Sequence, residues 1–457
     1  MTRGARISAF PTPAVLPTTE ADVVAAFAIE HAGRFMFDHA RRQWRVFFGH
    51  AWHSDGDGAV VRALQAFLTA RIGQAATLSD VADRDAQLKL LVRCLRACAI
   101  KQLVDLATNH AALATDGTMW DTKPLLVAVK NGVVDLETGT LRPGSPGDML
   151  TFVAGAEFDA TAACPTFEQF LSEVMPDQAT RLVLWAAIGY TLSGLSVEHL
   201  LFLLFGVTRA GKSTLVRALE HAFGDLAATI AFASLTVTKA RHGAEASPDI
   251  ATLPGKRFVS ASEVRTDGRF DEARIKSLTG GDTIVCRALY SRPFEYRPQF
   301  KLWLSVNDLP RASEDPAFWA RCRVFPFRRS FLGHEDRTLD ARLREEAPGI
   351  LAWAVEGFHA YRSGGLQPSA DMTAEAGRWR DDNDVIGQFI ASVNTTGRVP
   401  VADLFGQYDT WANGERLGPR ERMSRNAFGK AIARTFPTTR SNGKTFVTIT
   451  SVQECSK

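Results

Sequence analysis

The sequence lacks a hydrophobic segment long enough to cross a membrane. The apolar run from Leu200 to Phe205 is far shorter than the roughly 20 residues that a spanning helix needs. The N-terminus also lacks the basic and then apolar pattern of a secretory signal. These two absences predict a cytosolic protein with no membrane among its partners.

Cysteine is scarce and scattered. No Cys-x-x-Cys pair occurs, which argues against a zinc site and against a disulfide framework; the six cysteines are Cys94, Cys98, Cys164, Cys286, Cys322 and Cys455. The spacing of Cys94 and Cys98 predicts that they share a helix face as two small buried side chains. A reduced protein without structural zinc is therefore expected.

Neither positive nor negative charge is in large excess. The chain has 53 Lys and Arg against 50 Asp and Glu, a net charge of +3, so any surface for nucleic acid must be local. With 457 residues, 46% of them hydrophobic and 23% charged, the composition is that of a soluble globular protein. The length predicts two to four domains with room for large cores.

One stretch carries a specific chemical pattern. Between the apolar run that ends at Phe205 and an amphipathic segment from Leu215 lies Gly206-Val207-Thr208-Arg209-Ala210-Gly211-Lys212-Ser213-Thr214. Glycines let backbone N–H groups close around phosphate oxygens, and a helix N-terminus adds a favourable field. In such a loop Lys212 reaches the β- and γ-phosphates and Ser213 ligates Mg²⁺. The pattern predicts a nucleoside triphosphate site; the alternative is a glycine-rich turn without nucleotide.

Two later apolar runs end in polar residues. One, from Phe258, leads to Glu263, and the other, from Lys301, leads to Asn307. In a parallel sheet the carboxyl ends of the strands border the P-loop crevice. There Glu263 would polarise the attacking water and help to hold Mg²⁺, and Asn307 would hold the water or the γ-phosphate. Taken singly, each is more typical of a solvated strand end or a turn.

Two arginines precede a further apolar run. Arg321 and Arg323 lie in Trp319-Ala320-Arg321-Cys322-Arg323-Val324-Phe325. An arginine that reaches the γ-phosphate of a neighbouring subunit accelerates hydrolysis by roughly 10³–10⁵. Arginines beside a strand are more commonly only solvated.

The N-terminal region, residues 1–112, is expected to be partly helical. Strands are predicted near 34–37 and 43–48, and packed helices over 59–112. Asp55-Gly56-Asp57-Gly58 has the Asp-x-Asp spacing of a two-metal polymerase site, but Asp and Gly also dominate turns, and a solvent turn is favoured. Residues 113–195 are expected to form a small α/β collar-like region, with a hairpin at Asn131-Gly132.

The C-terminal region is predicted to be a helical connector over 346–384 and a winged-helix-like domain over 385–457. Its helix at 424–434 and its final hairpin lie in a locally basic stretch. That excess supports a duplex-DNA surface with Arg425, Lys430 and Lys444 among its cations. A solvated basic face is the alternative.

The order of these motifs resembles the superfamily 3 helicase core, and closely that of the phage/plasmid and poxvirus-type primase-helicases. The resemblance rests on blocks that run from the collar to the arginine pair: Asn131-Gly132-Val133-Val134-Asp135-Leu136, Lys276-Ser277-Leu278-Thr279-Gly280-Gly281-Asp282, Arg287-Ala288-Leu289-Tyr290, Lys301-Leu302-Trp303-Leu304 and Arg323-Val324-Phe325-Pro326-Phe327. It covers most of the chain beyond about residue 40. It implies an α/β, AAA+-like P-loop NTPase core over 196–345.

The resemblance also assigns roles. Lys212 and Ser213 correspond to Walker A, Glu263 to Walker B, Asn307 to the sensor and Arg321 to an arginine finger acting in trans. The sequence departs from the family at Ser262, in place of the frequent first Walker B acid, and at Ala320, in place of the first arginine of its block. Arg323 is therefore the reserve finger.

A hairpin is predicted from Cys286 to Tyr296, turning at Ser291-Arg292-Pro293. In the family, a hairpin at this place projects into the ring channel and grips DNA phosphates. Arg287 and Arg292, and less directly Lys276, would supply these contacts, which are independent of base sequence. An ordinary surface hairpin is the alternative.

The function implied by the resemblance is an ATP- and Mg²⁺-dependent DNA helicase of a phage, prophage or plasmid replication system in the cytoplasm of a bacterial host. It would translocate on single-stranded and forked DNA as a homo-hexameric ring. The chain has no room for the primase domain of many relatives, so a separate primase or polymerase is expected. The alternatives are an origin-binding initiator or DNA-remodelling ATPase, and a nucleotide-dependent switch that does not unwind DNA.

Overall fold

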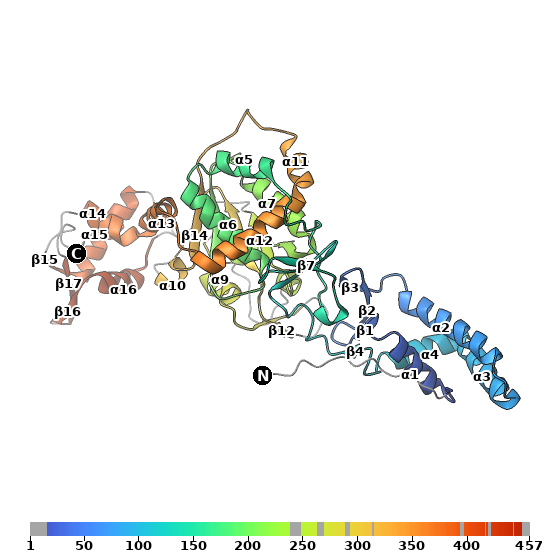
Figure 1. The fold of residues 1–457 in the computed structure, drawn as a ribbon. Coiled ribbons are helices and arrows are strands. Elements are labelled where there is room, and N and C mark those ends of the chain that lie inside the picture. Colours follow the sequence, from blue (N-terminus) through green and yellow to red (C-terminus); the bar gives the residue numbers. More distant parts are fainter. Residues whose placement is uncertain are drawn as a thin grey trace.

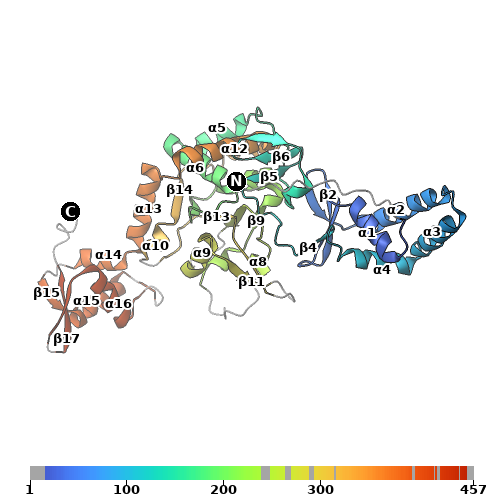
Figure 2. The same ribbon diagram turned by 60° about the horizontal axis from the view of Figure 1, so that its bottom comes forward.

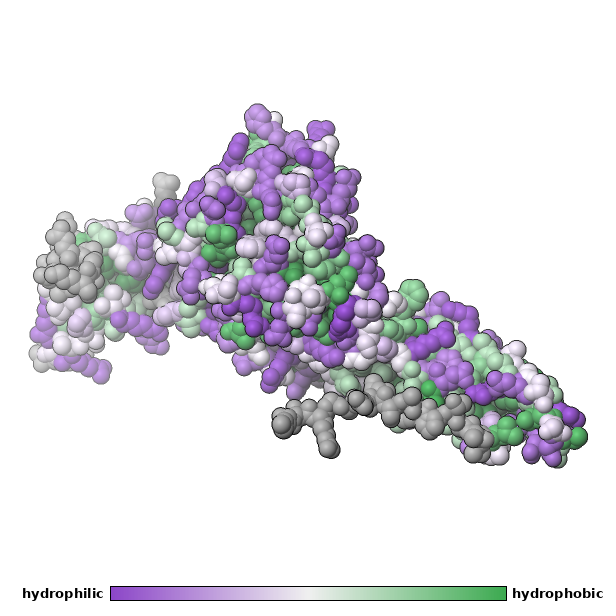
Figure 3. Space-filling model, in the orientation of Figure 1, coloured by the Kyte–Doolittle hydropathy of each residue, from purple (hydrophilic) through white to green (hydrophobic). Residues whose placement is uncertain are grey.

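The computed structural model describes residues 16–237, 248–262, 269–287, 293–312, 315–393, 397–415, 417–418, 422–441 and 443–449. These residues form a central α/β unit with an N-terminal unit on one side and a C-terminal unit on the other (Figures 1 and 2). On the face drawn in Figure 3, polar and apolar residues are interspersed over all three units. Within the described residues, no helix is long and apolar enough to span a bilayer.

The N-terminal unit packs helices against a small sheet. Its sheet has the strand order β3-β2-β1-β4, and one hydrophobic cluster joins the sheet to the helices. The elements are α1 (Glu20–Glu30), β1 (Phe35–Asp38), β2 (Gln43–Phe48), β3 (Ala51–Ser54), α2 (Ala59–Ala76), α3 (Val81–Cys94), α4 (Ala97–Ala107) and β4 (Ala114–Thr115). The predicted strands and helices are both present.

The Asp-x-Asp segment is a turn that starts α2. The Asp55 carboxylate accepts backbone N–H groups from Ala59 at 2.7 Å and Val60 at 3.0 Å, and Asp57 pairs with Arg62 at 2.8 Å. Both carboxylates therefore satisfy local donors, as expected for the favoured turn. The described residues contain no group of three or more His, Cys, Asp or Glu side chains arranged to hold a metal.

The expectation for Cys94 and Cys98 is wrong. Helix α3 ends at Cys94 and α4 begins at Ala97, so the two cysteines lie on different helices. Cys94 is buried and Cys98 is exposed. The helical period continues through the sequence while the backbone turns at Leu95 and Arg96. No disulfide links the five cysteines in the described part of the chain.

A three-stranded antiparallel sheet follows, formed by β5 (Leu126–Val129), β6 (Gly132–Asp135) and β7 (Thr140–Arg142). The predicted Asn-Gly turn joins β5 to β6. The Asn131 side chain closes this turn onto a later segment, because its Oδ1 accepts the Phe158 N–H at 2.9 Å and its Nδ2 donates to the Phe158 carbonyl at 3.0 Å.

The central sheet contains five parallel strands in the order β14-β8-β13-β10-β9. The strands are β8 (Leu201–Gly206), β9 (Ala227–Thr229), β10 (Phe258–Ser262), β13 (Lys301–Val306) and β14 (Cys322–Phe327). β8 lies between β13 and β14, because its nearly uninterrupted apolar sequence suits a strand buried on both faces. The loop after β8 therefore lies at the C-terminal ends of the strands, between the ends of β13 and β14.

Alternate residues of the sheet feed two hydrophobic cores, as the period of a strand requires. Phe202, Trp303 and Phe325 face α5 (Pro165–Val174), α6 (Gln178–Leu192), α7 (Lys212–Phe223) and α12 (Ala347–Gly364), which cover one side of the sheet (Figure 1). The neighbouring positions in these strands face α9 (Glu272–Thr279) and α13 (Ala370–Asn383). Because α5, α6 and α12 share the core of the sheet, the compact unit is larger than the expected 196–345.

The crossing of α6 and α12 depends on two glycines. A Cβ at Gly189 would lie 2.0 Å from the Phe358 backbone nitrogen, and one at Gly357 would lie 2.4 Å from the Trp185 carbonyl oxygen. Only hydrogen fits at these points, so the two helix backbones approach closely.

The C-terminal unit has its own hydrophobic core. Along the chain it contains α14 (Val385–Ser392), β15 (Gly397–Pro400), α15 (Val401–Gly414), α16 (Arg425–Thr435), β16 (Thr438–Ser441) and β17 (Lys444–Ile449). β17 pairs antiparallel with both β15 and β16. The predicted helix is present as α16, where the Ser424 hydroxyl accepts the Ala427 N–H.

Candidate nucleotide-binding site

The loop from Gly206 to Gly211 joins β8 to α7 by the strand-to-helix geometry that the sequence predicts. Gly206 has φ +152° and Gly211 has φ +93°, conformations that side chains disfavour. A Cβ at Gly206 would also lie 1.9 Å from the carbonyl oxygen of Phe327. The loop therefore lies directly against the end of β14, and α7 points its N-terminus at the sheet edge.

Lys212 is buried and turned back onto this loop. Its Nζ donates to the carbonyl oxygens of Gly206 and Val207, the latter at 2.9 Å, and to Asn307 Oδ1 at 2.9 Å. The Lys212 residue is only 6% exposed, and its ammonium needs such partners because burial of an unsolvated charge is costly. The same atom is placed where the loop would hold phosphate oxygens.

Asn307 and Ser213 complete the described part of the site. Asn307 follows β13, whose Val306 pairs with Phe205, so its amide lies at the same sheet edge as the loop. Ser213 is exposed in the first turn of α7. Strand β10 ends at Ser262, opposite Ser305 of β13. Glu263, the predicted Walker B acid, lies outside the described residues.

Arg321 and Arg323 lie at the N-terminal ends of the parallel strands, opposite to the P-loop. Cys322 pairs with Leu201 at the start of β8, whereas the P-loop follows the C-terminal end of β8. At about 3.3 Å per residue, this separation is roughly 20 Å. Arg321 Nη1 donates to the Ala317 carbonyl at 2.7 Å. A single chain therefore does not bring Arg321 to its own Lys212.

Arg323 is tied to its own chain more firmly. Its Nη1 donates to the carbonyl oxygens of Ala320 at 3.0 Å and Cys322 at 3.2 Å. Burial lowers the pKa of this guanidinium below its usual value. Arg321 thus makes fewer hydrogen bonds within its own chain than Arg323, and fewer would break if its side chain turned toward a neighbouring subunit.

Sequence reasoning missed the segment that follows β14. Ser330 Oγ donates to the Thr208 carbonyl at 3.0 Å and the Phe331 N–H donates to the Arg209 carbonyl at 3.0 Å. Arg328 and Arg329 precede these contacts and therefore lie beside the P-loop. The sequence alone offers only the signal that two cations directly follow an apolar strand, because the neighbour of that strand is known only from the fold.

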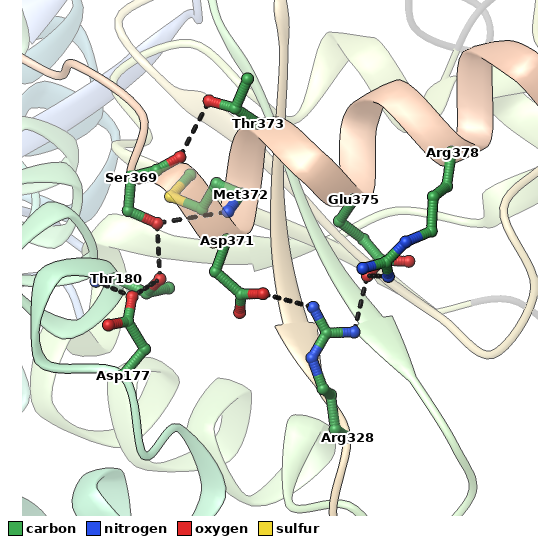
Figure 4. Close-up of polar contacts among 9 residues, drawn as sticks. All are labelled: Asp177, Thr180, Arg328, Ser369, Asp371, Met372, Thr373, Glu375 and Arg378. Atoms are coloured by element: carbon green, nitrogen blue, oxygen red, sulfur yellow. Dashed lines mark hydrogen bonds and ion pairs between the residues drawn. The ribbon is translucent and has the colours of Figure 1, made fainter.

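Arg328 holds α13 by paired carboxylates. It donates to Asp371 and, at 2.6 Å, to Glu375, which also accepts from Arg378 at 2.7 Å (Figure 4). Glu375 is buried, and buried charges in proteins are normally paired in this way. These ion pairs hold α13, the helix that leads to the C-terminal unit, beside the segment that follows β14 and contacts the P-loop.

The predicted hairpin is present as β11 (Ile284–Cys286) paired antiparallel with β12 (Phe294–Tyr296). Arg287 follows β11 and is exposed, as a DNA contact requires, while Arg292 lies outside the described residues. Lys276 lies on α9 in an ion pair with Asp315.

The predicted cations of the C-terminal unit are exposed. Arg425 and Lys430 lie on α16, and Lys444 begins β17. Arg398 on β15 places its guanidinium 4.3 Å from the centre of the Phe446 ring. The described part of the unit thus presents cations from both its helix and its sheet.

Comparison with known families matches two segments of the chain. Residues 25–176 match a model described as D5 N terminal like, and residues 204–322 match a family of unknown function, DUF5906. The second segment includes the P-loop and Arg321, and it ends one residue before Arg323.

Two similar proteins come from viruses. A candidate helicase of Acanthamoeba polyphaga mimivirus is 28% identical over 409 residues, covering 83% of this chain and 40% of its own length. A candidate helicase of Invertebrate iridescent virus 3 is 29% identical over 225 residues, covering 47% of this chain and 24% of its own. The chain therefore spans less than half the length of either relative.

Among solved structures, the chain is similar to the A form apo structure of the NrS-1 C-terminal region. The TM-score is 0.52 at 11% identity, with 95% of this chain and 100% of that chain covered. This likeness concerns the mixed α/β fold alone. The D5 N terminal like segment and the helicase-named relatives agree with the motif resemblance and support a D5-type superfamily 3 helicase.

Proposed function

We propose that the chain binds ATP with Mg²⁺ at the P-loop, hydrolyses it, and uses the reaction to move along and unwind DNA. The observation that carries this proposal is the contact of Lys212 with Asn307 at the P-loop edge of the parallel sheet. A lysine and an amide that converge there would meet the γ-phosphate and the attacking water. Ser213 would ligate Mg²⁺, and Glu263 would complete the metal and water site.

We further propose that the site is completed by a second copy of the chain. Arg321 lies roughly 20 Å from the P-loop of its own chain, at the far edge of the sheet. In a closed ring with head-to-tail contacts, one edge of each subunit meets the opposite edge of the next. Arg321 would then act as the finger on a neighbour's ATP. A homo-hexamer around single-stranded DNA is the assembly we propose.

Two surfaces are proposed to contact DNA. Arg287, beside the β11–β12 hairpin, together with Arg292, would contact phosphates in the channel. Lys276 would join them less directly, because it must exchange its Asp315 partner for a phosphate. In the C-terminal unit, the order helix, strand, two helices and two strands supports a winged helix, in which α16 would enter the major groove. Arg425, Lys430 and Lys444 would supply its cations.

The setting we propose is replication of a mobile element, in which a separate primase or polymerase makes the primers. The sequence suggests a phage, prophage or plasmid in the cytoplasm of a bacterium. The named relatives described above belong to viruses.

A second candidate function is binding to a replication origin with DNA remodelling but little processive unwinding. The exposed cations on α16 and β17 favour it, because they suit duplex DNA. The test is unwinding of a forked substrate. Displacement of the labelled strand that requires ATP supports the helicase. DNA-stimulated ATP hydrolysis without any strand displacement would exclude it and favour the origin-binding remodeller.

A further inference from the structure

A cavity of about 410 Å³ opens beside the P-loop, on the side of β14. Its walls come from three parts of the chain: the connection between α5 and α6 (Met175, Pro176 and Asp177), the end of β14 with the residues after it (Pro326, Arg328 and Arg329), and Asp371 of α13. Figure 4 shows how Asp177, Arg328 and Asp371 are grouped. The volume lies in the usual range for small-molecule pockets.

Two of these walls are continuous with segments that touch the P-loop. Phe327, between the lining residues Pro326 and Arg328, pairs with Gly206. On the other wall, α5 lies against the last residue of the loop, because a Cβ at Gly211 would be 2.8 Å from Val174 Cγ1. The cavity and the phosphate loop are therefore neighbouring parts of one site.

The lining residues suit a flat ring attached to a sugar. Met175, Pro176 and Pro326 offer apolar surface. Arg329 is exposed, and its guanidinium lies 4.8 Å from the centre of the Phe331 ring. A planar guanidinium stacks on aromatic faces, including those of nucleobases. Asp177 Oδ2 accepts from Thr180 and Asp371 Oδ1 accepts from Arg328, so Asp177 Oδ1 and Asp371 Oδ2 are the acceptors that would bind ribose hydroxyls.

The walls are also held in place before any ligand arrives. Arg328 is fixed by Asp371 and the buried Glu375. Thr180, at the start of α6, shares a buried hydrogen bond of 2.7 Å with Ser369, which caps α13. A pocket with such fixed walls loses little conformational freedom on binding.

We propose that this cavity receives the base and ribose of the nucleoside triphosphate whose phosphates lie on the P-loop of the same chain. Arg329 stacks on the base, and the two prolines and Met175 cover its other surfaces. The proposal rests on the proposed function, because it assigns the nucleoside part of the same ligand. It also places that nucleoside against the Arg328 contacts that anchor α13.

The test compares two ligands that share a triphosphate, Mg²⁺–ATP and Mg²⁺–tripolyphosphate, by titration calorimetry on the full chain. Pro176→Trp fills the cavity, and Arg329→Ala removes the stacking cation from an exposed position that folding does not require. Ala179→Trp, on the exposed face of α6, and Arg337→Ala, in the loop beyond the cavity, are the matched controls.

Pro176→Trp is expected to weaken ATP binding by about tenfold or more. Arg329→Ala is expected to weaken it by about fivefold. Both should bind tripolyphosphate within about twofold of wild type, and the controls should bind both ligands normally. Equal loss of both ligands, or unchanged ATP affinity in both cavity variants, would overturn the cavity assignment while leaving the P-loop site in place. Failure of wild type to bind either ligand would overturn the proposed function and this assignment together.

Discussion

Lys212 Nζ donates a hydrogen bond of 2.9 Å to Asn307 Oδ1, joining residues that lie 95 positions apart in the chain. The contact exists because β8 and β13 are parallel neighbours, so that their loops leave the same sheet edge. Asn307 thus orients the ammonium that would contact the γ-phosphate. In the proposed site, ATP would compete with this amide and with two loop carbonyls for Lys212.

Substitution of Asn307 by Ala is therefore expected to slow ATP turnover by about 10²–10³, the usual effect of removing one positioned polar group from a transition state. ATP affinity should change by less than about fivefold, because the loop itself still binds the phosphates. Steady-state hydrolysis and equilibrium binding of ATP give the two values. Asp308→Ala, at the next and equally exposed position, is the control. A large loss of affinity with normal turnover would contradict this role.

Lys212→Ala should abolish turnover.

Arg321→Ala is expected to reduce turnover by about 10³ while sparing ATP binding and assembly, since the arginine stabilises only transition-state charge. Arg323→Ala, whose guanidinium is half-buried against its own chain, is the matched control. Arg321→Ala alone should therefore hydrolyse ATP only about 10³-fold more slowly than wild type, and Lys212→Ala alone should not hydrolyse it.

When Arg321→Ala and Lys212→Ala subunits are mixed, activity should return, because an intact P-loop can then face an intact arginine. The measurement is ATP hydrolysis as a function of the mixing ratio. If the mixture is no more active than its parts, the site does not lie between two chains.

The double variant Arg425→Ala, Lys430→Ala is expected to weaken duplex-DNA binding. If both cations contact phosphates, the slope of log K against log salt should fall by about 2, at roughly 0.9 per contact. Fluorescence anisotropy over a range of salt concentrations measures that slope. Lys89→Ala with Arg93→Ala, on the N-terminal helix α3, removes the same charge elsewhere. Equal effects from both pairs would indicate a general charge effect rather than a binding face on α16.

Gly189→Ala is expected to lower the free energy of unfolding by about 1–3 kcal/mol, because the added methyl group meets the backbone of α12. The control is Gly364→Ala at the end of α12, where a Cβ meets nothing within 4 Å. That control should be neutral, or more stable by up to about 1 kcal/mol, through helix propensity. Chemical denaturation of both variants compares them directly. Equal stability of the two would show that the α6–α12 crossing is not tight.

Asp148 is expected to make stability depend on acid pH. Burial acts to raise the pKa of this carboxyl, but the bidentate contact with Arg142, at 2.8 Å for each bond, and the Ser145 N–H outweigh it and lower the pKa below 3.8. Because the folded pKa is depressed, the stabilisation is present above pH 3.8 and is lost as the pH falls through the folded value.

Asp148→Asn should therefore cost about 1–3 kcal/mol at neutral pH. The difference from wild type should shrink as the pH is lowered past the ordinary value. Denaturation at a series of pH values measures both effects. A difference that stays constant with pH would indicate a packing effect of the substitution, not a charge effect.

Local features of the fold could be predicted from the sequence, because neighbouring residues determine them. The P-loop between β8 and α7, the β5–β6 and β11–β12 hairpins and the capped helix α16 each depend on a short pattern of glycine, polar and apolar residues. The prediction for Cys94 and Cys98 failed because a continuous helical period does not reveal where the backbone turns between two helices. The segment after β14 was missed because its role depends on which strand lies beside it.

The sequence alone determined that Lys212 and Ser213 begin a helix after a buried strand, because the residues that define the loop are adjacent in the chain. Only the tertiary structure decided that Asn307 reaches Lys212, that Arg321 lies at the far edge and that Arg328 and Arg329 border a cavity. The reason is physical: strand order in a parallel sheet is set by crossover connections and by the packing of helices on both faces. Those are properties of the whole chain that no short stretch contains.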